Sequence, residues 1–327
     1  MTRITRRQFS AGATAAALTL ALGQIARAQS YPTRPVRFIL PFAAGGVADV
    51  TARLTADKLG EKLGQRFVIE NQPGPGGIIA GRAIAAAAPD GHTLGLLTNG
   101  TAISVAMYKS LPYDPMKDFA TISALGNFDL VFATNAASEF RTLPDVLKRA
   151  REEPGKLNIG TIAVGSTQQL GAELLKSLAN VDIQIVPYRT TPDVIVALLR
   201  NDLALMTDFY AAMKGQLLDR KIRPVGTSGL KPTPFLPDVP PVAEAGVPGY
   251  EVTSWNGLCA PAGTPAGIID LLNRAVREIL EVTEVKAKYA ELGIEAKASS
   301  PEELKARFGA DVRKWNDLIE RTGIPKL

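Results

Sequence analysis

Strand-like and helical stretches alternate along this chain, and this alternation restricts its fold more than any other feature of the sequence. Short strand-like runs lie at 36–40, 67–70, 93–97, 157–161, 183–186 and 203–206. Helices fit the stretches 47–63, 78–88, 142–152, 167–179, 192–201, 265–281 and 300–321, the first of them with apolar side chains three and four positions apart. Such alternation predicts βαβ units and mostly parallel sheets flanked by helices.

Capping sequences mark where two of these helices begin. Ser300-Pro301-Glu302-Glu303 supplies a serine cap, a proline at the first helical position and a glutamate that completes a capping box. Ser166 is followed three residues later by Gln169, which predicts a second capping box before the helix at 167–179.

Two extended runs divide the chain into two lobes. The run 123–132 contains no helical pattern, and a similar run at 249–258 follows a proline-rich stretch. Two crossings in one chain predict a lobe formed by 129–250 that is inserted into another lobe formed by 29–128 and 251–327. A length of 327 residues suits two domains of ordinary size.

The first 28 residues have the pattern of an export signal peptide. Their apolar run at 13–22 is too short to span a membrane, and Ala26-Arg27-Ala28 suits cleavage before Gln29. Thr5-Arg6-Arg7-Gln8-Phe9 resembles the twin-arginine motif of bacteria, although Ala11 stands where that motif often has lysine. An ordinary general-secretory signal stays open as the alternative. Either route places the protein outside the cytoplasm, and we expect it in the periplasm.

The composition excludes several classes of protein. One cysteine and one histidine cannot form a disulfide or supply the three or four ligands of a zinc site. A Ser-His-Asp or Cys-His system would have to use His92, which lies in a turn-like segment. Removal of residues 1–28 takes away four arginines and no acid, so the net charge falls from +5 to +1. This near-neutral protein has no basic clusters for nucleic acid, and no second apolar stretch reaches spanning length.

Loops that follow predicted strands are candidate ligand sites. In α/β sheets, helix N-termini point free N–H groups beyond the carboxyl ends of the strands. Gly45 and Gly46 stand directly before a helix, where glycine permits close approach of a ligand to the backbone. They predict an anion site without Lys or Arg, or else a tight turn in which Asp49 stabilises the start of its own helix.

Further loops end strands with polar side chains. The hydroxyl groups of Ser166 and Thr167 could bind a carboxylate, or they could merely cap their helix. Thr98-Asn99-Gly100-Thr101, Tyr188-Arg189-Thr190-Thr191 and Thr207-Asp208-Phe209 occupy similar places. Asp208 could receive a ligand amine or a water molecule, although a single Asp at a strand end is more often a helix cap.

One glycine-rich loop suggests a dinucleotide site but has the wrong spacing. Gly74 and Gly76 follow a strand and precede a helix, yet a GxGxxG motif would need glycine where the chain has Ile79. The phosphate-loop pattern GxxxxGK[ST] does not occur either. The sequence therefore predicts no nicotinamide or flavin cofactor and no metal.

A series of motifs extends over the whole chain that follows the export signal. These motifs are Tyr31-Pro32-x-x-Pro35, Pro41-Phe42-x-x-Gly45-Gly46-x-x-Asp49, Asn71-x-x-Gly74-x-Gly76-Gly77, Pro89-Asp90-Gly91, Pro187-Tyr188, Phe235-Leu236-Pro237-Asp238-Val239-Pro240-x-Val242-x-Glu244-x-Gly246, and Trp255-x-Gly257-x-x-Ala260-Pro261-x-Gly263-Thr264-Pro265. In this order they resemble the Bug family, the periplasmic substrate-binding proteins of tripartite tricarboxylate transporters.

The resemblance implies a two-lobed clamshell similar to type II periplasmic binding proteins, with a mostly parallel sheet in each lobe. It implies capture of one small carboxylate, such as a dicarboxylate, an aromatic acid or an amino acid, for the membrane subunits of a transporter, without catalysis. We expect a monomer. The family's ligand-binding loops, with the loop after Tyr188, correspond here to Phe42, Ala43, Ala44, Gly45, Gly46, Asp49, Thr98, Asn99, Thr101, Gly165, Ser166, Thr167, Gln168, Tyr188 and Thr190. Asp208 joins these candidate ligand-binding residues because of its own place at a strand end.

Two departures from the family pattern affect the expected choice of ligand. Arg189-Thr190-Thr191 stands where many members have glycines, and the segment from Thr207 to Tyr210 is bulkier than is common there. Phe209 or Tyr210 could stack on an aromatic acid. Two other functions stay open: an exported α/β hydrolase or lyase, and a solute-binding protein that feeds a sensor kinase instead of a transporter.

Overall fold

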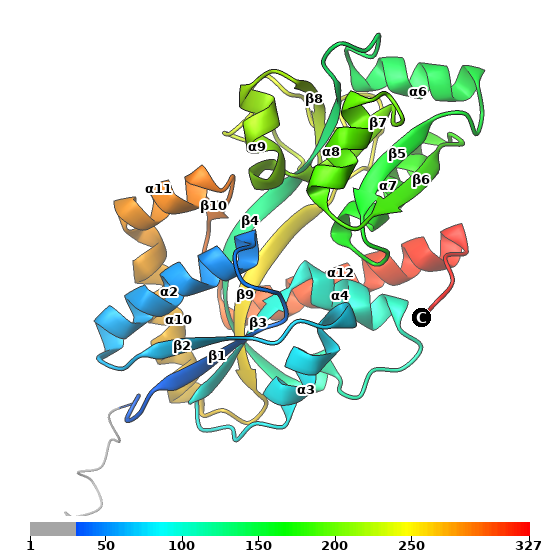
Figure 1. Cartoon of the computed structure of the whole chain (residues 1–327). Coiled ribbons are helices and arrows are strands. Elements are labelled where there is room, and N and C mark those ends of the chain that lie inside the picture. The colour runs from blue at the N-terminus through cyan, green and yellow to red at the C-terminus, as the bar shows by residue number, and fades with distance from the viewer. Residues whose placement is uncertain (1–30) are drawn as a thin grey trace, which may run out of the picture.

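Each of the two lobes contains a mixed β-sheet that helices cover, and two long strands run from one lobe into the other (Figure 1). The computed structural model describes residues 31–327. The predicted export signal at 1–28 lies outside the described residues. Within 31–327, no helix is both long enough and apolar enough to cross a membrane.

The first lobe, at the bottom of Figure 1, has the sheet order β2-β1-β3-β9-β4, and β10 also pairs with β4. Its elements are β1 (Val36–Leu40), α2 (Val47–Leu63), β2 (Phe67–Asn71), the 3-10 turn η1 (Pro75–Gly77), α3 (Ile78–Ala85), β3 (Thr93–Thr98), α4 (Asn99–Met107), α5 (Pro115–Asp118), β9 (Thr253–Pro261), α10 (Ala266–Glu281), α11 (Thr283–Glu291), β10 (Glu295–Ala296) and α12 (Pro301–Thr322).

The second lobe, at the top of Figure 1, has the sheet order β4-β7-β5-β6, and β8 also pairs with β4. Its elements are α6 (Leu143–Glu152), β5 (Asn158–Ile162), α7 (Thr167–Ala179), β6 (Gln184–Tyr188), α8 (Thr191–Leu199), β7 (Leu205–Phe209), α9 (Tyr210–Leu218) and β8 (Ile222–Thr227).

The long strand β4 (Phe119–Asn135) belongs to both sheets. Its residues up to Asp129 pair with β9, and its residues from Leu130 onwards pair with β7 and β8. The extended run predicted at 123–132 lies inside this strand. The second predicted run, 249–258, lies only partly in a strand, because β9 begins at Thr253.

The predicted two-lobed α/β fold is confirmed, and the prediction of mostly parallel sheets needs one correction. The outer pairs β1–β2, β1–β3, β5–β6 and β5–β7 are parallel, as βαβ units require. The pairs that contain β4 or β9 are antiparallel. For the pair β4–β9 the reason is that β4 leads the chain out of the first lobe and β9 leads it back, so the two strands run in opposite directions.

Apolar side chains on both faces of the first sheet form its core. Phe38 and Leu258 are fully buried in a cluster with residues of α2 and α10, and Ile39 and Trp255 are buried in another with residues of α3, α4 and α12. The helix α4 was not predicted, because its apolar residues do not form one stripe. Six of its nine residues are buried, which leaves little polar face for a sequence pattern to show.

Candidate functional site

A cavity of about 610 Å³ lies between the two lobes. The strand ends of both sheets contribute to it, with Thr98 at the end of β3 and Ile162 at the end of β5. This is the position where α/β sheets bind ligands, because strand ends and helix N-termini face the same space. The cavity is therefore the candidate ligand site.

Several helices begin at the wall of this cavity, and α2, α4 and α7 each place at least two residues in it. Gly46, Val47 and Ala48 line it at the start of α2, Thr98 and Thr101 at the start of α4, and the segment from Ser166 to Gln168 at the start of α7. The first N–H groups of a helix have no intrahelical acceptor, and the helix dipole adds partial positive charge there. Three such N-termini around one cavity favour an anionic ligand.

The remaining wall is largely apolar. Phe42, Val164, Phe128, Phe209 and Trp255 are among its lining residues. Phe128 and Phe209 pack edge to face with ring centroids 4.9 Å apart. Among the described residues that line the cavity, no side chain is Asp, Glu, Lys, Arg or His. An anion here would be held by backbone and hydroxyl donors instead of by a cation.

Asp49 does not line the cavity but organises the start of α2. Its buried carboxylate accepts hydrogen bonds from Arg53, from Asn71 and from the N–H of Gly45. The Arg53 guanidinium is the main cause that lowers the pKa of Asp49 to about 2. Asp49 therefore stays ionised, and its carboxylate accepts the hydrogen bond that the Gly45 N–H could otherwise give to a ligand. Of the two glycines, Gly46 lines the cavity and Gly45 does not.

At the start of α4, the two threonines that line the cavity cap their own helix. Thr98 Oγ1 accepts a hydrogen bond from the N–H of Thr101 at 3.3 Å, and Thr101 Oγ1 accepts one from the N–H of Thr98 at 3.3 Å. The side chain of Asn99 between them points elsewhere, because it bonds to Thr167 and Trp315 instead of lining the cavity.

At the start of α7, the predicted capping box is displaced by one residue. Ser166 Oγ accepts from the N–H of Gln169 at 3.1 Å, as predicted. The side chain of Gln169, however, accepts from the N–H of Gly165 at 2.7 Å and not from that of Ser166. The capping box predicted at Ser300 and Glu303 is present in full.

Asp208 lies behind the cavity wall and supports two residues that line it. Its carboxylate accepts hydrogen bonds from Gln168 Nε2 at 2.8 Å, from Thr191 Oγ1 at 2.5 Å and from the N–H of Phe209 at 2.7 Å. Burial raises the pKa of Asp208, and these three hydrogen bonds act in the opposite direction. Gln168 and Thr191 line the cavity, whereas Asp208 is the anchor that holds them.

The structure brings about half of the expected site residues to the cavity wall. Those that line it are Phe42, Gly46, Thr98, Thr101, Gly165, Ser166, Thr167 and Gln168. Those that do not line it are Ala43, Ala44, Gly45, Asp49, Asn99, Tyr188, Thr190 and Asp208.

The residues expected to alter the choice of ligand also include some that line the cavity and some that do not. Phe209 lines the cavity, and Arg189 does not. Tyr210 is also outside it, stacked on Phe235 with ring centroids 5.9 Å apart. Thr190 caps α8 by accepting from the N–H of Asp193. An aromatic ligand in this cavity could therefore meet Phe209 but not Tyr210.

Two parts of the wall were missed from the sequence. The turn η1 contributes Gly76 and Gly77, and the crossing strand β9 contributes Ser254 and Asn256. The glycines carry a signal in the sequence, since they form a loop after a strand, but this signal does not by itself indicate contact with a ligand. Nothing local marks β9 as a wall of the site, because its place depends on pairing with β3 and β4.

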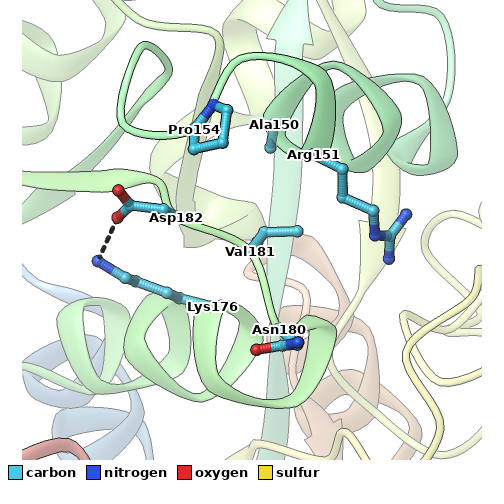
Figure 2. Close-up of a pocket in the computed structure, with 7 residues that line it drawn as sticks. All are labelled: Ala150, Arg151, Pro154, Lys176, Asn180, Val181 and Asp182. Atoms are coloured by element: carbon cyan, nitrogen blue, oxygen red, sulfur yellow. Dashed lines mark ion pairs between the residues drawn. The ribbon is translucent and has the colours of Figure 1, made fainter.

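A second depression lies in the second lobe, between α6 and α7 (Figure 2). Lys176 points across it to Asp182, with Nζ and Oδ1 3.3 Å apart. Arg151 donates to the backbone carbonyl of Ala179 at 3.4 Å. None of the expected site residues lines this depression, and its basic side chains have partners in the chain.

The chain is similar to known proteins over about nine-tenths of its length. Protein BugT of Bordetella pertussis is 30% identical over 298 residues, which cover 90% of this chain and 91% of that protein. The R. palustris protein Rpa4515, solved with adipate, is 34% identical with a TM-score of 0.80, over 91% of this chain and 100% of that one. MatC from Rhodopseudomonas palustris, solved with malate, is 32% identical with a TM-score of 0.76, over 88% and 100% of the two chains.

A family model described as the tripartite tricarboxylate transporter family receptor matches residues 51–324. The match spans both lobes and the segments that line the cavity from Gly74 onwards. Because it covers well over half of the sequence, the chain belongs to the tripartite tricarboxylate transporter receptor family, as its Bug-like motifs predicted.

Proposed function

We propose that this protein binds a small carboxylate solute between its lobes and delivers it to the membrane subunits of a tripartite tricarboxylate transporter. The observation that carries the proposal is the cavity at which α2, α4 and α7 begin, with no charged side chain among its described lining residues. Relatives solved with adipate and with malate support a carboxylate ligand.

The energetics of such a site are sufficient for tight binding. A hydrogen bond to a charged group contributes roughly 1.5–3 kcal/mol. Micromolar binding corresponds to about −8 kcal/mol, which a few such bonds supply when the apolar wall excludes water and ordering costs stay modest. Phe42, Val164 and Phe209 give the ligand an apolar surface to contact, so we expect a carboxylate with a hydrocarbon body.

Replacing Thr167 with valine is expected to weaken carboxylate binding at least tenfold. Thr167 lines the cavity at the first position of α7, and valine has nearly the same shape but no hydroxyl. Calorimetry with adipate, malate, aromatic acids and acidic amino acids, each compared with its amide, measures the effect.

Ser166→Ala is the matched control. The Ser166 hydroxyl caps α7, so its loss should lower the free energy of unfolding by about 1 kcal/mol and change affinity less than threefold. Amides that bind as tightly as the acids, or an unchanged affinity of Thr167→Val, would show that the carboxylate assignment is wrong.

We also propose that the protein performs no catalysis, requires no cofactor and acts as a monomer. A hydrolase or lyase needs a nucleophile with a base, or a carboxylate pair, in its cleft. The single histidine, His92, stands just before β3, at the opposite end of that strand from Thr98 and the cavity.

A sensor kinase is the second candidate partner, in place of the transporter. Cross-linking to transporter membrane subunits in cells, with no cross-link to a kinase, separates the two.

The division into lobes is part of the same proposal. We place residues 29–128 and 251–327 in the first lobe and residues 129–250 in the second. Strand β4 changes partners between Asp129 and Leu130, one residue after this boundary, and this closeness supports the division.

We propose export to the periplasm by the twin-arginine route, with cleavage after Ala28. Replacing Arg6 and Arg7 with lysine is expected to leave the precursor in the cytoplasm, because that route reads the arginine pair itself. Fractionation of cells followed by immunoblotting measures this. Normal export of the variant would point to the general-secretory route, while leaving the periplasmic location intact.

A further inference from the structure

The two neighbouring hydroxyls at the start of α7 use their protons differently. Ser166 Oγ accepts from the N–H of Gln169 and donates to the carbonyl of Ile162 at 2.9 Å, so its proton is already used within its own loop. Thr167 Oγ1 has its hydrogen bond, at 3.2 Å, with the side-chain amide of Asn99. The direction of this one bond decides whether Thr167 has a proton to offer a ligand.

Trp315 fixes the direction of that bond. The amide of Asn99 is fully enclosed between Thr167 and the indole of Trp315, whose Nε1 lies 3.0 Å from Asn99 Oδ1. An indole N–H can only donate, so the amide must turn its oxygen to Trp315. Its NH₂ group then faces Thr167 and can only donate. The Thr167 oxygen is therefore the acceptor.

A hydroxyl that accepts from an amide keeps its own proton for another partner. Thr167 lines the cavity, whereas Asn99 and Trp315 do not. Hydrogen bonds from such a donor are strongest when the acceptor is ionised, as in a carboxylate. The three residues also come from different parts of the fold: Asn99 begins α4, Thr167 begins α7 in the other lobe, and Trp315 lies in α12 near the end of the chain.

We propose that Trp315 and Asn99 are positioning residues that set the Thr167 hydroxyl as a hydrogen-bond donor to the bound carboxylate. This inference rests on the proposed function, because it requires an anion in the cavity. It adds two residues outside the cavity wall to the set that determines selectivity. It also gives a role to Asn99, which was expected to contact the ligand but instead donates a hydrogen bond to Thr167 in the cavity wall.

A double-mutant cycle with Trp315→Phe and Thr167→Val tests the proposal, with adipate and malate as calorimetric probes. Without the indole N–H, the Asn99 amide is free to turn over and take the Thr167 proton. Trp315→Phe should therefore weaken binding about fivefold in the wild-type background and less than twofold in the Thr167→Val background. Thr167→Ser keeps the hydroxyl and should restore the sensitivity to Trp315→Phe. An equal loss in all backgrounds, or no loss, would overturn the proposal.

Asn99→Asp supplies a second variant of nearly identical shape. An ionised carboxylate can only accept, so it draws the Thr167 proton away from the cavity, and its negative charge also repels an anionic ligand. Affinity should therefore fall at least as far as in Thr167→Val. If the Trp315→Phe protein melts below the assay temperature, Asn99→Asp replaces it in the double-mutant cycle. An equal loss of affinity with and without the Thr167 hydroxyl then overturns the proposal. A wild-type protein that binds no carboxylate of the panel would contradict the proposed function itself. Binding by the wild type with an additive cycle contradicts the positioning role alone.

Discussion

Replacing Trp255 with alanine is expected to lower the free energy of unfolding by about 4–6 kcal/mol, a large part of the net stability of a typical domain. The ring of Trp255 is fully buried, packs edge to face on Phe308 and lies 5.4 Å from the Arg307 guanidinium. Its Nε1 donates to Asp311 Oδ2 at 2.6 Å. The substitution leaves a large cavity and removes a donor from a buried carboxylate.

Thermal unfolding measures this loss, and we expect the melting temperature to fall by about 10 °C or more. Two variants make the measurement specific. Trp255→Phe keeps most of the volume and should lose about half as much stability. Leu218→Ala removes a side chain that is 69% exposed and should change the melting temperature very little. A fall of only a few degrees for Trp255→Ala would show that the crossing strand does not depend on this contact.

Replacing Asp129 with asparagine is expected to stabilise the protein at pH 8 and to have almost no effect at pH 4. Asp129 is the last β4 residue before the strand changes partners, and its Oδ1 has no hydrogen-bond partner within residues 31–327. Burial is the main cause that raises the pKa of Asp129 to about 6. The carboxylates of Glu251 and Glu295 add to the rise, and Thr253 and Arg307 oppose it.

The sign of the effect follows from the raised pKa. The folded state holds the Asp129 proton more tightly than the unfolded state does, so the stabilising contribution is complete below about pH 4 and is lost as pH rises through about 6. The rise in the pKa of Asp129 to about 6 corresponds to about 3 kcal/mol of stability. Melting curves of both proteins from pH 4 to pH 8 should diverge by about 5 °C or more at the upper end. Parallel curves at all pH values would contradict the prediction.

Local sequence patterns were sufficient for much of the fold. The run that became β1 was predicted with its observed bounds, because four of its five residues, all but Arg37, are apolar and prolines flank it on both sides. The start of α12 was predicted from Ser300 and Glu303, because their reciprocal capping hydrogen bonds join residues only three positions apart. By contrast, α4 was not predicted, because it is buried on most sides and its first residues have the composition of a polar loop.

The candidate site was predictable as a set of strand ends but not as a set of contacts. Sequence alone identifies Asp49 and Asp208 as carboxylates near helix starts. It does not reveal that Arg53 and Gln168 donate hydrogen bonds to these carboxylates, which lie outside the cavity wall. The contact between Asn99 and Trp315 joins residues 216 positions apart, and no local pattern can indicate it. The same holds for the β9 residues in the cavity wall.

The shared strand β4 also determines which parts of the molecule can form early in folding. The second sheet consists of the end of β4 and of β5 to β8, which follow one another in the chain without interruption. The first sheet is different, because β9 lies between β3 and β4 and closes contacts such as that of Cys259 with Gly95, 164 residues away. Closing so long a loop carries an entropy cost before its contacts can compensate for it. During synthesis from the N-terminus, the lobe that contains β1 is therefore begun first and completed last. Until β9 has been synthesised, the edges of β3 and β4 that it covers stay unpaired and can associate with other chains.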